Sequence, residues 1–258
     1  MRRLEFSEKD LRMIGEEWDR VAEIRRSQIE GGLDLSFDHV LLPSIRSLSE
    51  GCNLEQVVDV GCGIGSVAAE MARDAQKVVG VDLSEESIRL AQSRFAKIKN
   101  LSFVSGSMED FAASQHHSSF SAAVANMSLM TALNLEPFVR AISNVLRPGG
   151  CFIFTITHPC FWPSYWGYID APWFQYKEEI VIEAPFKISL APGSGLTTTH
   201  IHRPLEMYVN TLESCGLSLD RMLEPVPSTE IQKAYPAPWH FPRFLAVRCV
   251  RTRNTRSR

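Results

Sequence analysis

The stretch VVDVGCGIGSVAAEMA (57–72) indicates the fold of this chain most directly. It opens with the β-branched run of a buried strand, passes through Gly61, Gly63 and Gly65, and closes with a helical pattern. Glycines at this spacing let the backbone turn tightly and approach a ligand, because no Cβ stands in the way. The spacing is GxGxG and lacks the third position of the GxGxxG dinucleotide fingerprint. We predict a strand, a ligand-binding loop and a helix.

An acidic residue ends the next predicted strand, in VVGVDLSEESIRLA (78–91). Asp82 follows Gly65 by 17 residues, at a place where a carboxylate can bind both hydroxyls of a ribose. Asp59 precedes the glycine loop and adds a second carboxylate at the same edge of the sheet. The alternative is an ordinary α/β turn with helix-capping acids. We favour a ligand site because both segments occur together.

Strand and helix patterns alternate between residues 54 and 156. Strands are expected at Gln56–Val60, Lys77–Val81, Leu101–Val104, Phe120–Ala125 and Cys151–Ile156. Helices are expected at Ser66–Arg73, Glu85–Lys99, Met108–Ala113 and Glu136–Leu146. The turn PGG (148–150) is expected to separate the last helix from the fifth strand. This alternation predicts βαβ units and a mostly parallel sheet.

The segment before the first strand, residues 1–53, is expected to form an N-terminal helical cap. Apolar residues recur there at helical spacing, which predicts an amphipathic helix. Ser7 with Asp10 resembles a capping box at its start, and Gly31 ends it. A short second helix is expected around Pro43–Leu48.

Residues 54–258 are expected to form the main domain, with an insertion at 158–204 that has no clear period. Eight of the 19 residues in HPCFWPSYWGYIDAPWFQY (158–176) are aromatic, which favours a lid or pocket wall. The alternative is a small satellite core beneath a long loop. A helix at Leu205–Ser214 and strands at Leu217–Leu223 and Phe244–Arg251 are expected to close the domain.

Residues 54–156 resemble the class I S-adenosylmethionine-dependent methyltransferases. DVGCGIG is similar to the first motif of that family and GVDLS to the second. LSFVSGSMEDF (101–111) resembles the adenine-contacting stretch, although an acid is typical where Ser107 stands. FSAAVANMSLM (120–130) resembles the fourth strand with Ser121 in place of the usual aspartate, and LRPGGCFIFTITHP (146–159) resembles the fifth. The resemblance implies an α/β fold: a Rossmann-like, doubly wound seven-stranded sheet, mostly parallel, with an antiparallel last strand.

The resemblance also implies S-adenosyl-L-methionine as cofactor and S-adenosyl-L-homocysteine as product. Asp59 and the Gly61–Gly65 loop would hold the methionine end, Asp82 the ribose and Met108 the adenine, with Asn126 and Met127 as the floor near the sulfonium. The expected cofactor-binding residues are Asp59, Gly61, Cys62, Gly63, Gly65, Asp82, Leu83, Ser107, Met108, Asn126 and Met127.

The acceptor is expected beyond the carboxyl ends of the strands. The polar candidates on the insertion are His158, His200, His202 and Arg203. We select His158 and His202 as candidate general bases, since a histidine near neutral pKa suits proton removal. Methyl transfer often needs only alignment, however, so both can equally be structural. Arg203 is a candidate partner for an acceptor carboxylate. The residues expected nearest an aromatic or apolar acceptor are Trp18, Tyr165 and Trp166.

Composition narrows the class of protein and its location. The 258 residues carry a net charge of −3, which argues against a broadly basic nucleic-acid-binding surface. The six cysteines form no CxxC pair and no zinc-type cluster, so no metal is expected and a reducing, cytoplasmic location is favoured. No signal peptide and no bilayer span is expected, so no membrane partner is predicted.

These observations predict a methyltransferase that moves a methyl group by in-line displacement to an oxygen or nitrogen atom of a small, aromatic or apolar acceptor, with a role in secondary metabolism. An RNA or protein methyltransferase is the first alternative, because the chain ends in RTRNTRSR (251–258). A nicotinamide-dependent oxidoreductase and a non-catalytic cofactor-binding protein are the others. A homodimer is possible, since the apolar face of the first helix could pack on a second subunit.

Overall fold

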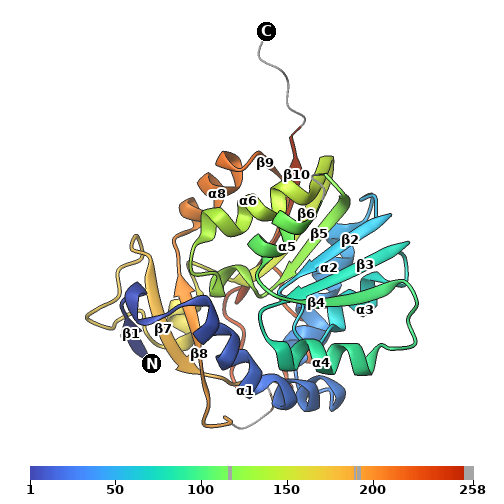
Figure 1. The fold of residues 1–258 in the computed structure, drawn as a ribbon. Coiled ribbons are helices and arrows are strands. Elements are labelled where there is room, and N and C mark those ends of the chain that lie inside the picture. Colours follow the sequence, from blue (N-terminus) through green and yellow to red (C-terminus); the bar gives the residue numbers. More distant parts are fainter. Residues whose placement is uncertain (116–117, 189, 191–192, 253–258) are drawn as a thin grey trace.

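A seven-stranded sheet forms the centre of the computed structural model, which describes residues 1–115, 118–188, 190 and 193–252 (Figure 1). The strands lie in the order β4-β3-β2-β5-β6-β10-β9. Their bounds are β2 Gln56–Val60, β3 Lys77–Asp82, β4 Leu101–Ser105, β5 Phe120–Asn126, β6 Leu146–Thr157, β9 Leu217–Leu223 and β10 Phe244–Arg251. Within this sheet β10 runs opposite to the other six strands and pairs antiparallel with both β6 and β9. The predicted fold class is therefore confirmed.

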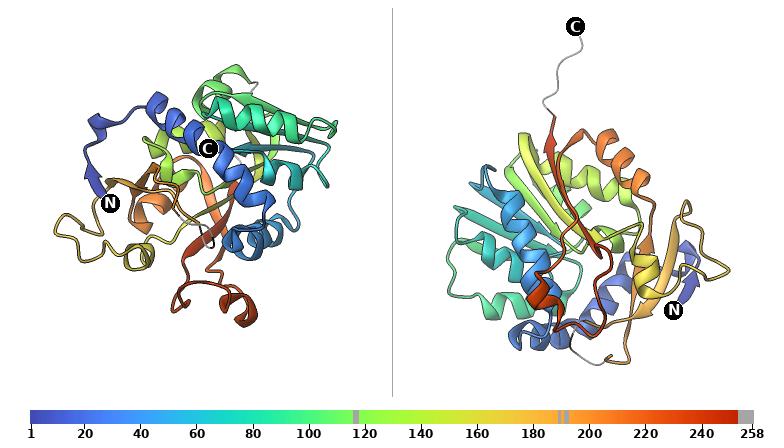
Figure 2. Two further views of the ribbon diagram at one scale, coloured as in Figure 1. Left: turned by 90° about the horizontal axis from the view of Figure 1, so that it is seen from below. Right: turned by 180° about the vertical axis from the view of Figure 1, so that it is seen from behind.

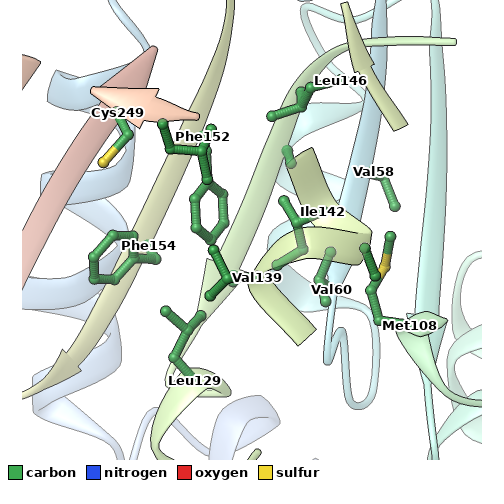
Figure 3. Packing of buried hydrophobic residues seen from close by; sticks show 14 of the residues in the cluster. Val58, Val60, Met108, Leu129, Val139, Ile142, Leu146, Phe152, Phe154 and Cys249 are labelled. Carbon is green, nitrogen blue, oxygen red and sulfur yellow. The ribbon is translucent and has the colours of Figure 1, made fainter. Parts of the chain in front are cut away.

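Helices cover both faces of this sheet. One face is packed by α5 (Met108–Ser114), α6 (Leu135–Val145) and α8 (Leu205–Ser214), with Val58, Ile142, Phe152 and Phe154 among its buried side chains (Figure 3). The other face is packed by α2 (Leu42–Ser49) and α3 (Ser66–Met71), which cover Val57. Successive strand residues point to opposite faces, so these runs are apolar throughout.

The fifth parallel strand begins earlier than predicted. β6 starts at Leu146, directly after α6, and the turn PGG (148–150) lies inside it. Phe120 pairs with Leu146, but Ala122 pairs with Cys151, so the register shifts across the turn. Extra residues on one strand form a bulge, which accommodates a proline without an N–H and Gly149 at a φ of +82°.

The N-terminal helices match the prediction except at one cap. α1 spans Leu11–Glu30 and ends at Gly31. Its N-cap is Asp10, whose side chain accepts a hydrogen bond from the Met13 amide at 2.7 Å, so the predicted capping role of Ser7 is wrong. Ser7 instead lies in a 3₁₀ turn, Phe6–Glu8, and a π-helical turn, Phe37–Leu41, precedes α2.

A second, three-stranded antiparallel sheet was not expected from the sequence. It consists of β1 (Arg2–Leu4), β7 (Ile180–Pro185) and β8 (Thr197–His202), in the order β1-β7-β8. Arg3 pairs with Ile182, and Leu4 packs beside Ile201. The first residues of the chain thus pair with a segment of the predicted insertion.

The remaining elements are short. α4 (Glu85–Arg94) links β3 and β4, η3 (Leu129–Thr131) follows β5, and α7 (Trp162–Trp166) begins the insertion. The segment between β9 and β10 contains α9 (Thr229–Gln232) and projects from the body before it returns to the sheet (Figure 2). No helix in the described parts of the chain is both long and apolar enough to cross a membrane.

Candidate functional site

A cavity of about 590 Å³ lies at the carboxyl ends of β2, β3 and β5. The glycine loop lines one end of it, α1 covers it, and α7 and β8 line the other end. α1 and the small sheet both lie at this end of the large sheet (Figure 1). The cavity is thus built by segments that are far apart in the sequence.

The three loop glycines share a left-handed backbone conformation but differ in what surrounds them. All have positive φ, between +51° and +80°. A Cβ on Gly61 would lie 2.5 Å from the Cβ of Ser128, and one on Gly65 would lie 2.6 Å from the ring of Phe103. Gly63 has no atom within 4 Å of such a Cβ. Gly61 and Gly65 therefore allow close packing, and Gly63 leaves space beside the loop.

Asp82 connects the end of β3 to the glycine loop. Its carboxylate accepts hydrogen bonds from the amides of Gly63 at 2.7 Å and Ser84 at 2.8 Å. The carbonyl of Val81 accepts bonds from the amides of Gly61 and Cys62 at 2.8 and 3.1 Å. Burial raises the pKa of Asp82. These bonds fix the loop to the neighbouring strand.

Asp59, in β2, is a buried carboxylate with no hydrogen-bond partner for either oxygen among the described residues. It is 1% exposed and lines the cavity. Burial, opposed by the nearby Ala68 amide and aided by the charge of Asp82, raises the pKa of Asp59 to about 7. A buried group of this kind suits a cationic ligand atom that would restore its charge.

The start of α5 differs from the expected adenine contact. Ser107 caps this helix: its hydroxyl accepts from the Asp110 amide at 3.0 Å and donates to the Asp110 carboxylate at 2.7 Å. Met108 is 3% exposed and lines the cavity. Glu109 also lines the cavity, and burial raises its pKa. Sequence reasoning missed Glu109, although it follows Met108 directly.

The end of β5 forms the floor of the cavity between its two ends. The Thr155 hydroxyl donates to Asn126 at 2.7 Å, and the Met127 amide donates to the Thr155 carbonyl at 2.9 Å. Met127 has a φ of +57°, which costs a non-glycine residue roughly 1–3 kcal/mol. Strain of this kind is typical of residues whose position matters more than their stability.

Aromatic side chains line the end of the cavity that faces away from the glycine loop. The residues expected near an acceptor, Trp18, Tyr165 and Trp166, all line the cavity, Tyr165 and Trp166 from α7 and Trp18 from α1. Trp18 packs edge-on against Phe186 with ring centroids 6.0 Å apart. The described residues include no group of three or more His, Cys, Asp or Glu side chains arranged to hold a metal ion.

A family described as a methyltransferase domain matches residues 57–150, the segment that builds the glycine loop and the central strands. Residues 57–150 of this chain form a methyltransferase domain of that family. The crystal structure of an S-adenosylmethionine-dependent methyltransferase from Mesorhizobium loti shares the fold, with a TM-score of 0.61 and 24% identity. That similarity covers 81% of this chain and 96% of the other.

Two curated relatives of the methyltransferase domain are O-methyltransferases. The ubiquinone biosynthesis O-methyltransferase of Albidiferax ferrireducens is 36% identical over 103 residues, which cover 39% of this chain and 40% of the relative. The fatty-acid O-methyltransferase of Mycolicibacterium smegmatis is 27% identical over 185 residues, 71% of this chain and 60% of the relative. The chain thus spans less than two thirds of the length of these relatives.

His158 and His202 do not line the large cavity of the methyltransferase domain. The Nδ1 atom of His158 accepts from the Cys160 amide at 3.2 Å, so its Nε2 donates to Glu224 at 2.8 Å. The Nε2 atom of His202 donates to the Tyr176 carbonyl at 2.9 Å. Burial lowers the pKa of His202. These bonds give both rings a structural role and argue against either as the base.

Arg203 does not reach the acceptor either. It is 1% exposed, donates to the carbonyl oxygens of Leu129, Ala132 and Leu133, and pairs with Glu179. The guanidinium therefore ties β8 to the segment after β5. Its donors already bind protein oxygens, which argues against the expected role of Arg203 in binding an acceptor carboxylate.

His200 is the histidine of the insertion that lines the cavity. It precedes His202 by two residues on β8, and its ring lies 5.9 Å from that of Trp166. Burial lowers the pKa of His200 to about 3, aided by the charge of Arg203 and by His202. The ring is neutral at physiological pH and can accept a hydrogen bond. The sequence marked His200 only as one of several polar candidates.

Proposed function

We propose that this chain is an S-adenosylmethionine-dependent methyltransferase acting on an oxygen or nitrogen atom of a small, apolar or aromatic acceptor. The observation that carries this proposal is a single cavity that joins the glycine loop and its carboxylates to an aromatic wall. A volume of about 590 Å³ falls within the range of small-molecule sites. The names of the two curated relatives support an oxygen atom as acceptor.

The residues at the glycine end fit this cofactor. Asp59 offers an unpaired, buried carboxylate to the ammonium of the methionine end, and Asp82 stands where the ribose hydroxyls would bind. Gly63 leaves room for close backbone approach. When bound, the cofactor supplies a methyl group on a positively charged sulfur that a lone pair of the acceptor can displace in line.

The protein contributes alignment and exclusion of water. Asn126 and Met127 would position the reacting atoms, and α1 with the aromatic wall would keep solvent out. His200 would accept a hydrogen bond from the acceptor hydroxyl or amine and orient it. Its low pKa makes it a weak base, so the proton would leave to solvent after transfer.

We further propose that residues 1–53 and 158–204 act together as the cover of the acceptor within one domain. Hydrogen bonds between α1 and β8 support this, because they tie the two segments to each other. A cytoplasmic location is supported by the six cysteines, all of which are free thiols.

Isothermal titration with S-adenosylhomocysteine tests the proposed function. We expect one site per chain, with a Kd on the order of 1–100 μM. Incubation with S-adenosylmethionine and pooled small-molecule acceptors should then release S-adenosylhomocysteine, detected by mass spectrometry. Absence of any binding to the folded protein would contradict the proposal.

A further inference from the structure

Arg243 places a buried positive charge in the cavity, away from the glycine loop. It is 2% exposed, lines the cavity and directly precedes β10. Its Nη2 atom donates to the carbonyl oxygens of Ala237 at 2.8 Å and Pro238 at 2.9 Å. The guanidinium carbon lies 3.9 Å from the ring centre of Tyr165 and 4.3 Å from that of Trp239. These contacts hold the guanidinium in one orientation.

This charge has no carboxylate partner among the residues that the structure describes. Burial lowers the pKa of Arg243 from a very high value, and the neighbouring phenols of Tyr165 and Tyr235 oppose that shift. A buried charge without a counter-ion is costly, and cation–π contacts offset only part of that cost. Within the described chain, the side-chain hydrogen bonds of Arg243 are those that its Nη2 atom donates to Ala237 and Pro238.

Opposite charges occupy opposite ends of the cavity. Asp59, Asp82 and Glu109 line the glycine end, where the positively charged methyl donor is proposed to bind. The other cations on the wall are already satisfied: Arg25 pairs with Asp34 at 2.6 Å, and Lys187 is exposed. Arg243 is therefore the cation placed to receive a negatively charged ligand group.

The strand register separates Arg243 from the proposed point of methyl transfer. Asn126 pairs with Thr155 on β6, and Phe244 pairs with Thr157 on the same strand. The ends of β5 and β10 are thus two strand spacings apart, about 10 Å. A group bound at Arg243 would be remote from the atom that receives the methyl group.

We propose that the acceptor carries a carboxylate that binds the guanidinium of Arg243 while its hydroxyl or amine lies near Asn126. This inference rests on the proposed function and narrows its substrate class to apolar or aromatic acids that keep their carboxylate in the product. A carboxylate matches the planar, fixed donors of a guanidinium better than a neutral group does. Trp162 lines the same end, and its buried Nε1 has no acceptor among the described residues, so it adds a second unsatisfied donor.

A purely structural role for Arg243 makes a different prediction. In that case the guanidinium only fixes residues 236–242 through the carbonyls of Ala237 and Pro238, and ligand charge has no effect on affinity. Comparing two ligands of the same shape, one anionic and one neutral, separates the two roles without a mutation.

The experiment is a calorimetric titration of the full chain, saturated with S-adenosylhomocysteine, with 2-naphthoate and with its neutral analogue 2-naphthamide. We expect the acid to bind about tenfold or more tightly than the amide. Arg243→Met should abolish this preference, and Arg243→Lys should keep part of it because the charge remains without the planar fork. Lys187→Gln, which removes an exposed cation from the wall, should leave the preference intact.

Three results would overturn the inference: equal affinity for acid and amide, a preference that persists in Arg243→Met, or tighter Arg243-dependent binding of 2-naphthyl phosphate than of 2-naphthoate. If Arg243→Met does not fold, comparing the acid with the amide in the wild type and in Arg243→Lys still tests whether Arg243 binds a carboxylate. A wild-type protein that fails to bind S-adenosylhomocysteine would contradict the proposed function instead. The two naphthyl ligands can then be compared in the protein alone.

Discussion

Two neighbouring carboxylates show how strongly a residue's role depends on its immediate partners. Asp82 is held by two backbone amides, those of Gly63 and Ser84, whereas Asp59 has no partner for either oxygen within the described structure. Both line the same end of the cavity. The first therefore shapes the loop, and the second is poised to respond to a ligand charge.

Replacing Asp82 with alanine should remove most of the affinity for S-adenosylhomocysteine. The change deletes the proposed ribose contacts and leaves the Gly63 amide without its acceptor, so the loop loses its shape. We expect a loss of about 100-fold or more by isothermal titration. Glu85→Ala alters an exposed acid three residues away and should bind as the wild type does; a similar loss in both variants would contradict the assignment.

Asp59 should make stability depend on pH in a specific direction. Its pKa of about 7 in the fold lies above the ordinary value of 3.8, so the folded protein binds more protons between those values and loses stability as pH rises. Asp59→Asn stays neutral at every pH. Relative to wild type, its free energy of unfolding should therefore rise by up to about 3 kcal/mol from pH 5 to pH 8.

Urea denaturation of both ligand-free proteins at the two pH values measures this difference. Comparing variants cancels the titration of most other groups. A difference that stays constant, or that falls towards pH 8, would show that Asp59 is already charged in the fold.

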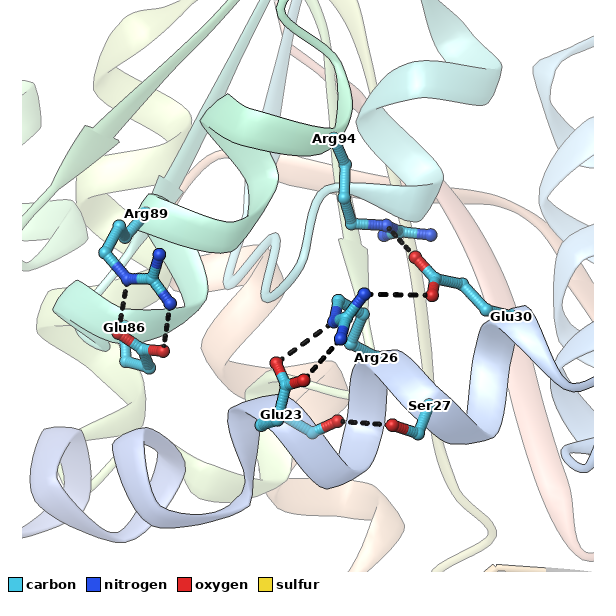
Figure 4. A network of polar contacts seen from close by, with 7 residues as sticks. All are labelled: Glu23, Arg26, Ser27, Glu30, Glu86, Arg89 and Arg94. Carbon is cyan, nitrogen blue, oxygen red and sulfur yellow. Dashed lines mark hydrogen bonds and ion pairs between the residues drawn. The ribbon is translucent and has the colours of Figure 1, made fainter.

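At the scale of elements, α1 connects the two sheets across the cavity. Buried Glu17 accepts hydrogen bonds from the amide and hydroxyl of Thr199 on β8, at 2.7 and 3.0 Å, and pairs with Lys9. Asp19 accepts from the Ser84 hydroxyl at 2.7 Å, next to α4. At the other end of α1, Glu30 accepts from Arg26 at 3.2 Å and from Arg94 of α4 at 3.0 Å (Figure 4).

Glu17→Ala should weaken the contact between α1 and β8 and destabilise the protein far more than Glu16→Ala does. It leaves the Thr199 amide without its acceptor and reduces the ion pairs of buried Lys9 to the one with Glu183 at 3.5 Å, so we expect a loss of roughly 3 kcal/mol in the free energy of unfolding. Glu16 is exposed and pairs only with exposed Arg12 among the described residues, so Glu16→Ala should cost less than about 1 kcal/mol. Equal losses in denaturant titrations would show that α1 is not anchored through Glu17.

At the scale of the whole molecule, the cavity depends on four separate parts of the chain. The glycine loop and strand ends form one end of it, and α1, the small sheet with α7, and the segment ending at Arg243 form the rest. The cavity therefore exists only when all four have assembled.

Local sequence patterns were sufficient to predict the strands and helices of the large sheet. The runs at 56–60 and 217–223 and the helix at 205–214 were predicted with the bounds that the structure has. Buried parallel strands are apolar throughout, and helices have a different period, so neighbouring residues carry the signal. The bulge in β6 was missed because PGG (148–150) is equally typical of a turn between elements.

Local patterns could not predict the pairing of strands that lie far apart in the sequence. β1 is three residues long and pairs with β7 across some 180 positions, so no local period marks either strand. The same limit explains the histidines. His158, His200 and His202 are alike in sequence, and only the structure shows that His200 alone of the three lines the large cavity, while hydrogen bonds to Glu224 and Tyr176 hold the other two rings.

By itself, the sequence determined the sheet, its helices and the glycine end of the site, because backbone geometry and burial along one segment impose residue types at fixed spacing. The tertiary structure alone decided which polar side chains bind other groups of the protein and which face the cavity. Arg203 and Arg243 are both buried arginines, yet protein oxygens and a carboxylate satisfy the first, while the second lacks a counter-ion. That difference arises from neighbours brought together by folding, since the net interaction of a buried charge depends on its surroundings and not on its place in the chain.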